Sequence, residues 1–363
     1  MEIGVPKETK DQEFRVGLSP MSVKVLAERK HQIFVETNAG IGSGFTDEDY
    51  RRAGAKIVAT ATEAWNRDLV IKVKEPLPDE YQYLHLQKGG LLFTYLHLAA
   101  SRELTENLLN SGINGIAYET VELTDGKLPL LTPMSVIAGR LSVQFGAHYL
   151  EKQQGGKGVL LGGVPGVSPG KVVILGGGVV GTEAAKIAVG MGAKVTILDI
   201  NVERLTYLET LFGSRVELLY SSSAQIEKVV PKADLLIGAV LILGRKAPIL
   251  VPRTLVQKMR PGSVIVDVAV DQGGCMETLR PTSHSNPSYV EERVVHVGIP
   301  NIPGAVPWSA TQALNNSTLP YVIKLADYGL DALEKDSALA KGLNVANGKL
   351  VHPAVKEVFP DFL

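Results

Sequence analysis

The stretch from Lys171 to Asp199 constrains the fold of this chain more than any other, and it reads KVVILGGGVVGTEAAKIAVGMGAKVTILD. An apolar run over 172–175 stops at three glycines, and a helical pattern then continues to Ala188. A second apolar run, 195–198, ends in Asp199. This order predicts a strand, a tight turn, a helix and a second strand.

Three glycines in this stretch match a pattern that binds dinucleotides. Gly176, Gly178 and Gly181 fit G-x-G-x-x-G, in which glycine permits a tight turn and lets the backbone approach a pyrophosphate at a helix N-terminus. Asp199 closes the next strand, where a carboxylate accepts hydrogen bonds from a ribose diol and repels a 2′-phosphate. We therefore expect NAD rather than NADP. The alternative is a structural glycine turn beside a surface aspartate.

Length and charge restrict the class of protein. With 363 residues the chain exceeds the usual size of one core, so two domains are expected. A net charge of −1 does not support a nucleic-acid or membrane partner attracted by bulk charge. The N-terminus lacks a signal-peptide pattern, and no apolar run reaches the ~20 residues that span a bilayer, so we expect a cytoplasmic protein. The single cysteine, Cys275, is interpreted as a small, partly buried residue rather than a catalytic thiol.

Strand and helix patterns alternate on both sides of the glycine stretch. Before it, strands are expected at 3–5, 33–35, 56–59, 69–73, 91–95 and 115–118; after it, at 216–220, 234–240, 263–268 and 294–297. A last helical portion, from Trp308 to near Leu339, is expected to return to the first domain. The predicted fold class is α/β, with two doubly wound Rossmann-like domains. The substrate domain is expected to comprise 1–130 and 308–363, and the NAD-binding domain 131–307.

Other glycine-rich segments are interpreted as structural. The loop 40–44 precedes a helix that begins with Asp47, Glu48 and Asp49, whose carboxylates suit a helix N-terminus but repel phosphate. The segment 155–170 leads into a strand rather than a helix, so a loop or hairpin is expected there. In the helical segment after Pro133, Gly139, Ser142 and Gly146 share one face, which predicts close packing against a neighbour.

Polar residues at strand ends are the first candidates for chemistry, because ligands of open α/β sheets bind at the carboxyl ends of strands. Lys72 and Lys74 close one apolar strand, with Lys74 nearer its exit, and His97 closes another. Asp271 follows SVIVDVAV, and Arg15 precedes the cap of the first helix. Each has a structural alternative: a solvated lysine, a packed histidine, a turn-capping aspartate or a surface arginine.

These residues would form one site if both domains present their carboxyl ends to a shared cleft. Arg15 suits a carboxylate, Lys74 and His97 suit a carbonyl or an amine, and Asp271 suits a role as their partner. The set is coherent for a 2-oxo or 2-amino acid held beside the nicotinamide. We therefore expect the active site in the cleft between the two domains.

The chain resembles the alanine dehydrogenases over essentially its whole length. The resemblance is carried by GVPKETKDQEFRVGLSP, KVKEP, LLFTYLHLAAS, PMSVIAGR, GGVPGV, the glycine loop with LDIN, and VDVAVDQGGC. It implies reversible NAD-dependent oxidative deamination of L-alanine to pyruvate and ammonium by a homohexamer, with no metal. Several of these segments are also similar to the NAD-binding component of proton-translocating transhydrogenase, which is the alternative. That relative is expected to lack a histidine at the position of His97.

The resemblance also implies roles for individual residues. His97 would be the general acid/base, with Asp271 and Lys74 completing the polar centre. Substrate binding is implied for Arg15, Lys74, Tyr95, Ser135 and Asn301, the last of which lies near the nicotinamide in the family. Cofactor binding is implied for Gly176, Gly178, Val180, Gly181, Asp199, Arg204, Ser221, Val240, Val297 and Asn301.

Overall fold

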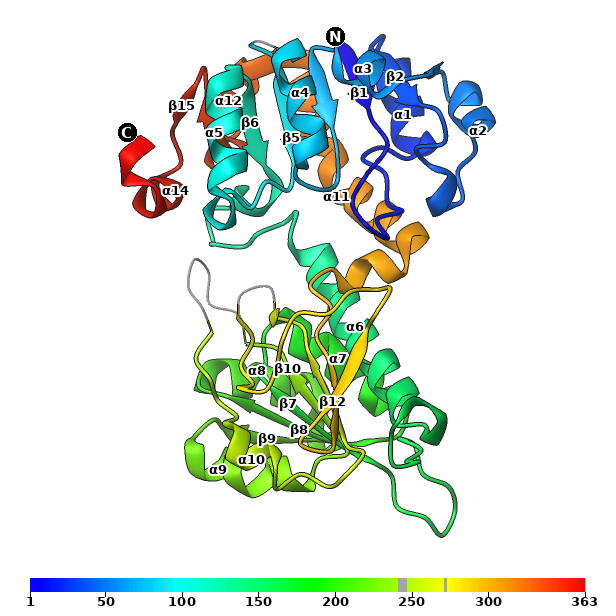
Figure 1. The fold of residues 1–363 in the computed structure, drawn as a ribbon, viewed down its shortest axis with the longest axis vertical. Coiled ribbons are helices and arrows are strands. Elements are labelled where there is room, and N and C mark those ends of the chain that lie inside the picture. Colours follow the sequence, from blue (N-terminus) through cyan, green and yellow to red (C-terminus); the bar gives the residue numbers. More distant parts are fainter. Residues whose placement is uncertain (88, 241–246, 271–272, 363) are drawn as a thin grey trace. The chain divides into compact units, whose positions relative to one another are not determined.

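The computed structural model describes residues 1–87, 89–240, 247–270 and 273–362, which form two compact units (Figure 1). Unit 1 contains Met1–Met134 and Val306–Leu363, and unit 2 contains Ser135–Ala305. The division falls a few residues from the boundaries expected at 130 and 308. Helix α6 (Thr132–Tyr149) carries the chain from unit 1 into unit 2.

Unit 1 is built on an eight-stranded sheet in the order β15-β14-β6-β5-β4-β1-β2-β3. Its strands are β1 (Glu2–Val5), β2 (Gln32–Glu36), β3 (Lys56–Val58), β4 (Leu69–Ile71), β5 (Leu91–Thr94), β6 (Asn114–Ala117), β14 (Leu343–Ala346) and β15 (Lys349–Leu350). The strands from β6 to β3 pair in parallel. Because the chain leaves β1 toward one edge and β4 toward the other, the carboxyl ends of these neighbouring strands form a topological switch point.

Helices cover both faces of the parallel part of this sheet. The helices of unit 1 are α1 (Pro20–Glu28), α2 (Asp47–Arg52), α3 (Ala61–Trp65), α4 (Tyr81–Leu84), α5 (Arg102–Ser111), α11 (Pro307–Tyr328), α12 (Ala332–Lys335), α13 (Ser337–Lys341) and α14 (Pro353–Val358). In Figure 1, α4 and α5 lie over β5 and β6, where Leu84, Leu104 and Leu92 share one core. Every residue of β4, β5 and β6 is buried, as expected for parallel strands covered on both faces.

Two hairpins lie outside the predicted pattern. β14 pairs antiparallel with β15 through a turn at Asn347 and Gly348, both with positive φ, and β14 extends the sheet beyond β6. Asn-Gly is a strong hairpin signal, so this pair was available from the sequence. β12 (Ser288–Glu291) pairs antiparallel with β13 (Val294–Val297) through Glu292 and Arg293, which also have positive φ but lack the usual turn chemistry.

Unit 2 has a seven-stranded sheet in the order β12-β13-β11-β10-β7-β8-β9. Its remaining strands are β7 (Lys171–Leu175), β8 (Lys194–Asp199), β9 (Val216–Tyr220), β10 (Leu235–Gly238) and β11 (Val264–Asp267), and its helices include α7 (Val179–Gly190), α8 (Val202–Phe212), α9 (Ser223–Val229) and α10 (Arg253–Val256). All pairs except β12 with β13 are parallel. The predicted α/β class with two doubly wound sheets is confirmed, although β4, β10 and β11 are shorter than expected.

The structural interpretations of the other glycines are supported. α2 begins with a capping box formed by Thr46 and Asp49, and a Cβ added to Gly40 would lie 2.6 Å from the Tyr50 ring. A Cβ on Gly139 would lie 2.3 Å from the Val180 carbonyl oxygen, and one on Gly146 would lie 2.3 Å from Leu235. These two glycines therefore let α6 pack closely against α7 and β10, which position the glycine-rich turn.

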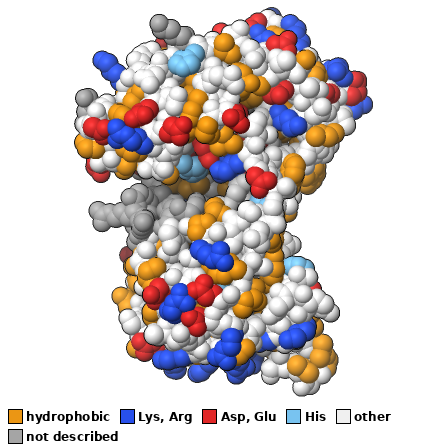
Figure 2. Space-filling view, in the orientation of Figure 1, with side chains coloured by type: hydrophobic (Ala, Val, Ile, Leu, Met, Phe, Trp, Pro, Cys, Tyr) orange, Lys and Arg blue, Asp and Glu red, His pale blue; other side chains and the backbone are white. Residues whose placement is uncertain are grey.

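The surface carries both signs of charge. On the face drawn in Figure 2, Lys and Arg side chains are interspersed with Asp and Glu over each unit, and hydrophobic side chains are scattered among them. This mixture agrees with the net charge of −1. Within the described residues, no helix has the length and apolar character needed to cross a membrane.

Candidate active site

In unit 1 the predicted site residues follow the carboxyl ends of adjacent strands. Arg15 lies in the segment after β1, Lys74 follows β4, and Tyr95 and His97 follow β5. Since β1, β4 and β5 are parallel neighbours in the sheet, the segments that carry these side chains all begin at the same end of it. The rule that ligands bind at the carboxyl ends of strands therefore indicated, from the sequence alone, one end of this sheet.

Lys72 is not solvated, contrary to the commoner expectation for a lysine at a strand end. Its ammonium is fully buried and lies 3.1 Å from Glu8 Oε2 and 2.8 Å from Glu80 Oε1, and both carboxylates are buried as well. Burial alone would lower the pKa of Lys72, but the two carboxylates outweigh it and raise that pKa. Lys72 is therefore a buried structural cation.

The same network fixes the backbone that carries Lys74. Glu8 Oε1 accepts a hydrogen bond of 2.6 Å from the Val73 amide and one of 3.4 Å from the Lys74 amide. Glu80 Oε2 accepts another, 2.9 Å long, from the Leu77 amide. The segment after β4 is thus tied to the segment after β1, and the position of Lys74 depends on this contact.

Lys74 itself carries an unusual amine. Burial, followed by the nearby Arg15 guanidinium, lowers the pKa of the Lys74 ammonium. Among the residues that the structure describes, its ammonium forms no hydrogen bond or ion pair with a side chain. A partly buried amine of lowered pKa is suited to bind a polar oxygen or to exchange a proton.

Arg15 is not a surface cation. It is 2% exposed, and its Nε and Nη2 donate to the two carboxylate oxygens of Glu13 at 2.7 and 2.5 Å. Its Nη1 lies 3.1 Å from Met134 Sδ. The bidentate pair with Glu13 fixes the plane of the guanidinium, which is the arrangement that makes arginine selective for carboxylates.

Tyr95 and His97 form a stacked pair at the end of β5. The Tyr95 hydroxyl donates to the Leu130 carbonyl at 2.6 Å, and burial raises the pKa of this phenol. The imidazole of His97 lies parallel to the Tyr95 ring, with ring centres 5.7 Å apart. His97 has φ 47°, and 41% of its side chain is exposed, so it is stacked but accessible to a substrate.

The glycine-rich turn of unit 2 has the geometry that its pattern predicts. Gly176 has φ 99°, and a Cβ on Gly181 would lie 1.9 Å from the Gly176 carbonyl oxygen. A Cβ on Gly178 would meet nothing within 4 Å. Gly176 and Gly181 are therefore required by the turn itself, whereas Gly178, at the N-cap of α7, borders open space beside helix N–H groups that lack helical partners.

Two side chains hold this turn from the neighbouring strand and helix. Asp199 accepts the Gly177 amide through Oδ2 at 2.6 Å and the Asn201 amide through Oδ1 at 2.8 Å. Arg204 donates to the Gly177 carbonyl at 2.6 Å and to Thr182 Oγ1 at 2.7 Å. Both residues thus support the turn directly, in addition to any contact with a nucleotide.

The other predicted residues of unit 2 are placed at strand ends and helix starts. Ser221 follows β9 and donates its amide to Asp199 at 2.9 Å, Val240 follows β10, and Val297 ends β13. Ser135 and Val180 lie in the first turns of α6 and α7. Asp271 lies outside the described residues. Cys275 is buried, and burial raises the pKa of its thiol well above the usual range, which supports the interpretation as a packed residue.

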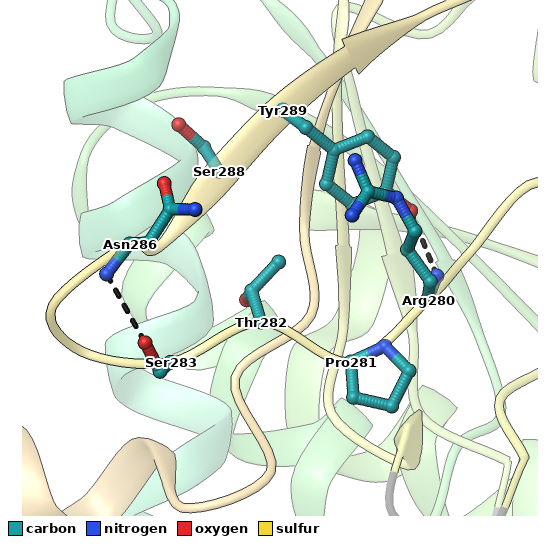
Figure 3. Close-up of a pocket in the computed structure, with 7 residues that line it drawn as sticks. All are labelled: Arg280, Pro281, Thr282, Ser283, Asn286, Ser288 and Tyr289. Atoms are coloured by element: carbon teal, nitrogen blue, oxygen red, sulfur yellow. Dashed lines mark hydrogen bonds between the residues drawn. The ribbon is translucent and has the colours of Figure 1, made fainter.

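Asn301 is held by the loop that precedes β12. His284 Nε2 lies 2.7 Å from the Asn301 carbonyl oxygen, and Thr282 pairs with Gly298 through its amide at 2.8 Å. Figure 3 shows the pocket of this loop, a volume of 330 Å³ lined by Arg280, Pro281, Thr282, Ser283, Asn286, Ser288 and Tyr289. None of these seven residues was predicted to bind a ligand, and the loop serves here to brace the segment that carries Asn301.

Sequence reasoning missed the carboxylates that surround the predicted cations and histidine. Glu8, Glu13 and Glu80 hold Lys72 and Arg15, and Glu119 accepts the amides of Leu96 and His97. Glu119 follows β6, so the rule that selected His97 would also have found it. No local sequence pattern links Glu8 or Glu80 to Lys72. Glu8 is far from Lys72 along the chain, and a turn separates Glu80 from it.

Together, the fold and these sites define a two-domain dinucleotide-dependent α/β enzyme. Comparison with protein-family models matches residues 4–138 to "Alanine dehydrogenase/PNT, N-terminal domain" and residues 142–353 to "Alanine dehydrogenase/PNT, C-terminal domain". The chain therefore belongs to the alanine dehydrogenase/PNT family, and it is an NAD-dependent amino-acid oxidoreductase.

Individual relatives agree with this assignment. An alanine dehydrogenase from Methanococcus maripaludis is 57% identical over 98% of this chain and 95% of its own length. A solved structure of L-alanine dehydrogenase is 72% identical, covers 100% of both chains and has a TM-score of 0.97. A transhydrogenase structure from Sinorhizobium meliloti is 26% identical, covers 98% of this chain and 100% of its own, and has a TM-score of 0.82.

The buried triad of Lys72, Glu8 and Glu80 predicts a large loss of stability on substitution of the lysine. Lys72→Met leaves two carboxylates buried without their cation, so the free energy of unfolding should fall by about 3 to 5 kcal/mol. Denaturant unfolding followed by circular dichroism measures it. Lys127→Met is the matched control, because Lys127 forms an exposed pair with Asp125. A loss no larger than that of Lys127→Met would show that the triad contributes little.

Proposed function

We propose that this protein is an L-alanine dehydrogenase that catalyses the reversible, NAD-dependent conversion of L-alanine and water to pyruvate and ammonium. The main support is the set of cationic and imidazole side chains at the switch point of unit 1, in a chain that belongs to the alanine dehydrogenase/PNT family. In this proposal unit 1 binds the substrate and unit 2 binds NAD.

The glycine-rich turn fits a dinucleotide. The open space beside Gly178 and the N-terminus of α7 suit a pyrophosphate, and the Asp199 carboxylate suits a ribose diol. Gly176, Val180, Gly181, Arg204, Ser221, Val240, Val297 and Asn301 are proposed to complete the cofactor site. These residues would hold NAD+, which would supply the hydride acceptor for oxidation at the alanine Cα.

The residues of unit 1 supply binding and proton transfer. Arg15, held flat by Glu13, is proposed to bind the substrate carboxylate, with Tyr95 and Ser135 lining the pocket. Lys74 would contact the carboxylate and the keto oxygen, since it follows β4 and its amine is mostly buried near the Arg15 guanidinium. Asp271, which lies outside the described residues, is proposed to complete the polar centre.

His97 is proposed as the general acid/base. It would take a proton from the water that adds to the iminium carbon and return a proton to the departing amine as the carbinolamine collapses. Its exposed ring, stacked on Tyr95, is available for both transfers. General acid–base catalysis of this kind contributes roughly 100 to 10,000-fold. From the family resemblance, we also propose that the protein is a homohexamer and that it is located in the cytoplasm.

The direct test is oxidation of alanine. Purified protein mixed with L-alanine and NAD+ should produce NADH, followed by its absorbance, and pyruvate should accumulate in equal amount. D-alanine is the control and should be inactive. The similarity to a transhydrogenase supports a second candidate, a subunit that passes hydride to a partner protein. NADH oxidation only with a second nicotinamide cofactor and a partner, and no reaction with alanine, would favour that candidate.

The two kinds of glycine in the turn predict two kinds of variant. Gly181→Ala forces a Cβ against a backbone carbonyl and should lower both the thermal midpoint and the affinity for NADH. Gly178→Ala meets no protein atom, so the thermal midpoint should stay unchanged. Its affinity for NADH should nevertheless fall at least about tenfold, or about 1.4 kcal/mol, because the methyl occupies the proposed pyrophosphate site. Calorimetry measures both. Unchanged NADH binding by Gly178→Ala would place the pyrophosphate elsewhere.

The charge of Asp199 predicts the cofactor preference. Asp199→Asn keeps an oxygen to accept a backbone amide but removes the charge that repels a 2′-phosphate. The ratio of kcat/KM for NAD+ to that for NADP+ should fall by about tenfold or more, which equals about 1.4 kcal/mol. Glu209→Gln, an exposed change on the same helix as Arg204, should leave the ratio fixed. An unaltered ratio in Asp199→Asn would show that the charge of Asp199 does not set the cofactor preference.

A further inference from the structure

A carboxylate outside the family-derived assignments lies against the segment that carries His97. Glu119 is in the short helical turn Tyr118–Thr120 that follows β6, the strand next to β5. Its Oε1 accepts a hydrogen bond of 2.5 Å from the His97 amide, and both of its oxygens lie 3.2 Å from the Leu96 amide. The carboxylate therefore binds two successive backbone N–H groups at the site of the histidine.

This contact falls where the backbone is strained. His97 has φ 47° and ψ 39°, in the left-handed region that residues other than glycine seldom adopt. Such a conformation persists only where the surroundings hold it, and a charged acceptor for two adjacent amides is a strong restraint. The Tyr95 ring, parallel to the imidazole, restrains the side chain from another direction.

The same carboxylate also faces the imidazole. Glu119 Oε1 lies 3.8 Å from His97 Nδ1, within ion-pair range but beyond hydrogen-bond length. Among the described residues, Glu119 is the only carboxylate in an ion pair with His97. Glu119 and the nearby Glu122 both act on His352, whose pKa is lowered by burial, and Glu122 also pairs with Lys341.

We propose that Glu119 is a positioning residue for His97: its carboxylate holds the strained turn and faces Nδ1, so that the opposite ring nitrogen, Nε2, exchanges protons with the substrate. This inference rests on the proposed function, because it gives His97 a proton to move. Together with the stacked Tyr95, Glu119 would then orient the acid/base group from the turn that follows the neighbouring strand β6. The arrangement follows the general rule that a carboxylate fixes the orientation of a working histidine.

A double-mutant cycle in the full-length protein tests the proposal. Glu119→Ala should lower kcat for the amination of pyruvate by about 10 to 100-fold, part of the ~100 to 10,000-fold typical of acid–base catalysis, because the imidazole loses its orientation. The KM for pyruvate and the Kd for NADH should change by less than about twofold, since neither Arg15, proposed to bind the substrate carboxylate, nor the cofactor site is altered. Glu119→Gln, which keeps an acceptor oxygen but no charge, should have an intermediate kcat.

A protein that already carries His97→Ala separates a positioning role of Glu119 from a general structural role. In a His97→Ala protein, the further change Glu119→Ala should leave the residual kcat unchanged, because no imidazole remains to be oriented. Glu122→Gln is the matched control, a nearby carboxylate expected to leave kcat at the level of the unsubstituted protein. Thermal midpoints and NADH binding verify folding, and Glu119→Gln carries the comparison if Glu119→Ala does not fold.

Each contrary result has a distinct meaning. Full kcat in Glu119→Ala, or an equal loss of kcat on adding Glu119→Ala to His97→Ala, overturns the positioning role and leaves the proposed function intact. Undiminished kcat in His97→Ala alone overturns the acid/base assignment of the histidine, and the positioning role with it. A parallel rise of the pyruvate KM in Glu119→Ala would place Glu119 in substrate binding instead.

Discussion

Buried charges must be paired, and this constraint organises the segments at the carboxyl ends of the parallel strands in unit 1. An ammonium as deeply buried as that of Lys72 is tolerated only with anionic partners, which Glu8 and Glu80 supply. Glu8 comes from the segment after β1, so satisfying the charge also joins two chain segments at the switch point. Its other oxygen binds the Val73 amide, and the location of Lys74 follows from that bond. The pairing that stabilises the buried ammonium of Lys72 therefore also fixes the position of the segment that carries Lys74.

The same pairing rule shapes the electrostatics of the proposed substrate site. Glu13 compensates Arg15 through two hydrogen bonds, yet Arg15 still contributes, after burial, to lowering the pKa of Lys74. Two cations held close together repel each other, and a bound anion relieves that repulsion. At the proposed substrate site, a bound carboxylate would therefore relieve this repulsion, whereas a neutral amine of the same size would not.

Local sequence predicted the parts of the fold and site that depend on local chemistry. The glycine turn and the strand-end positions of Lys74 and His97 each follow from a short pattern. The burial of Lys72 and Arg15 did not, because their partners are fixed by tertiary pairing rather than by spacing along the chain. The hairpin at Asn347 was predictable from its turn residues, whereas the one at Glu292 and Arg293 was not, since tertiary context imposes its positive φ angles.

The two units prepare their sites by different physical means, and the difference determines how each responds to change. In unit 2 the turn is set by steric limits, so one methyl group at Gly181 is enough to disrupt it. In unit 1 the carboxylate of Glu119, in the turn after β6, holds His97 in a conformation that costs about 1 to 3 kcal/mol. Loss of such an acceptor need not unfold the domain, because the backbone can relax to an ordinary conformation. It would instead move the imidazole, so catalysis is expected to be more sensitive than stability to changes around His97.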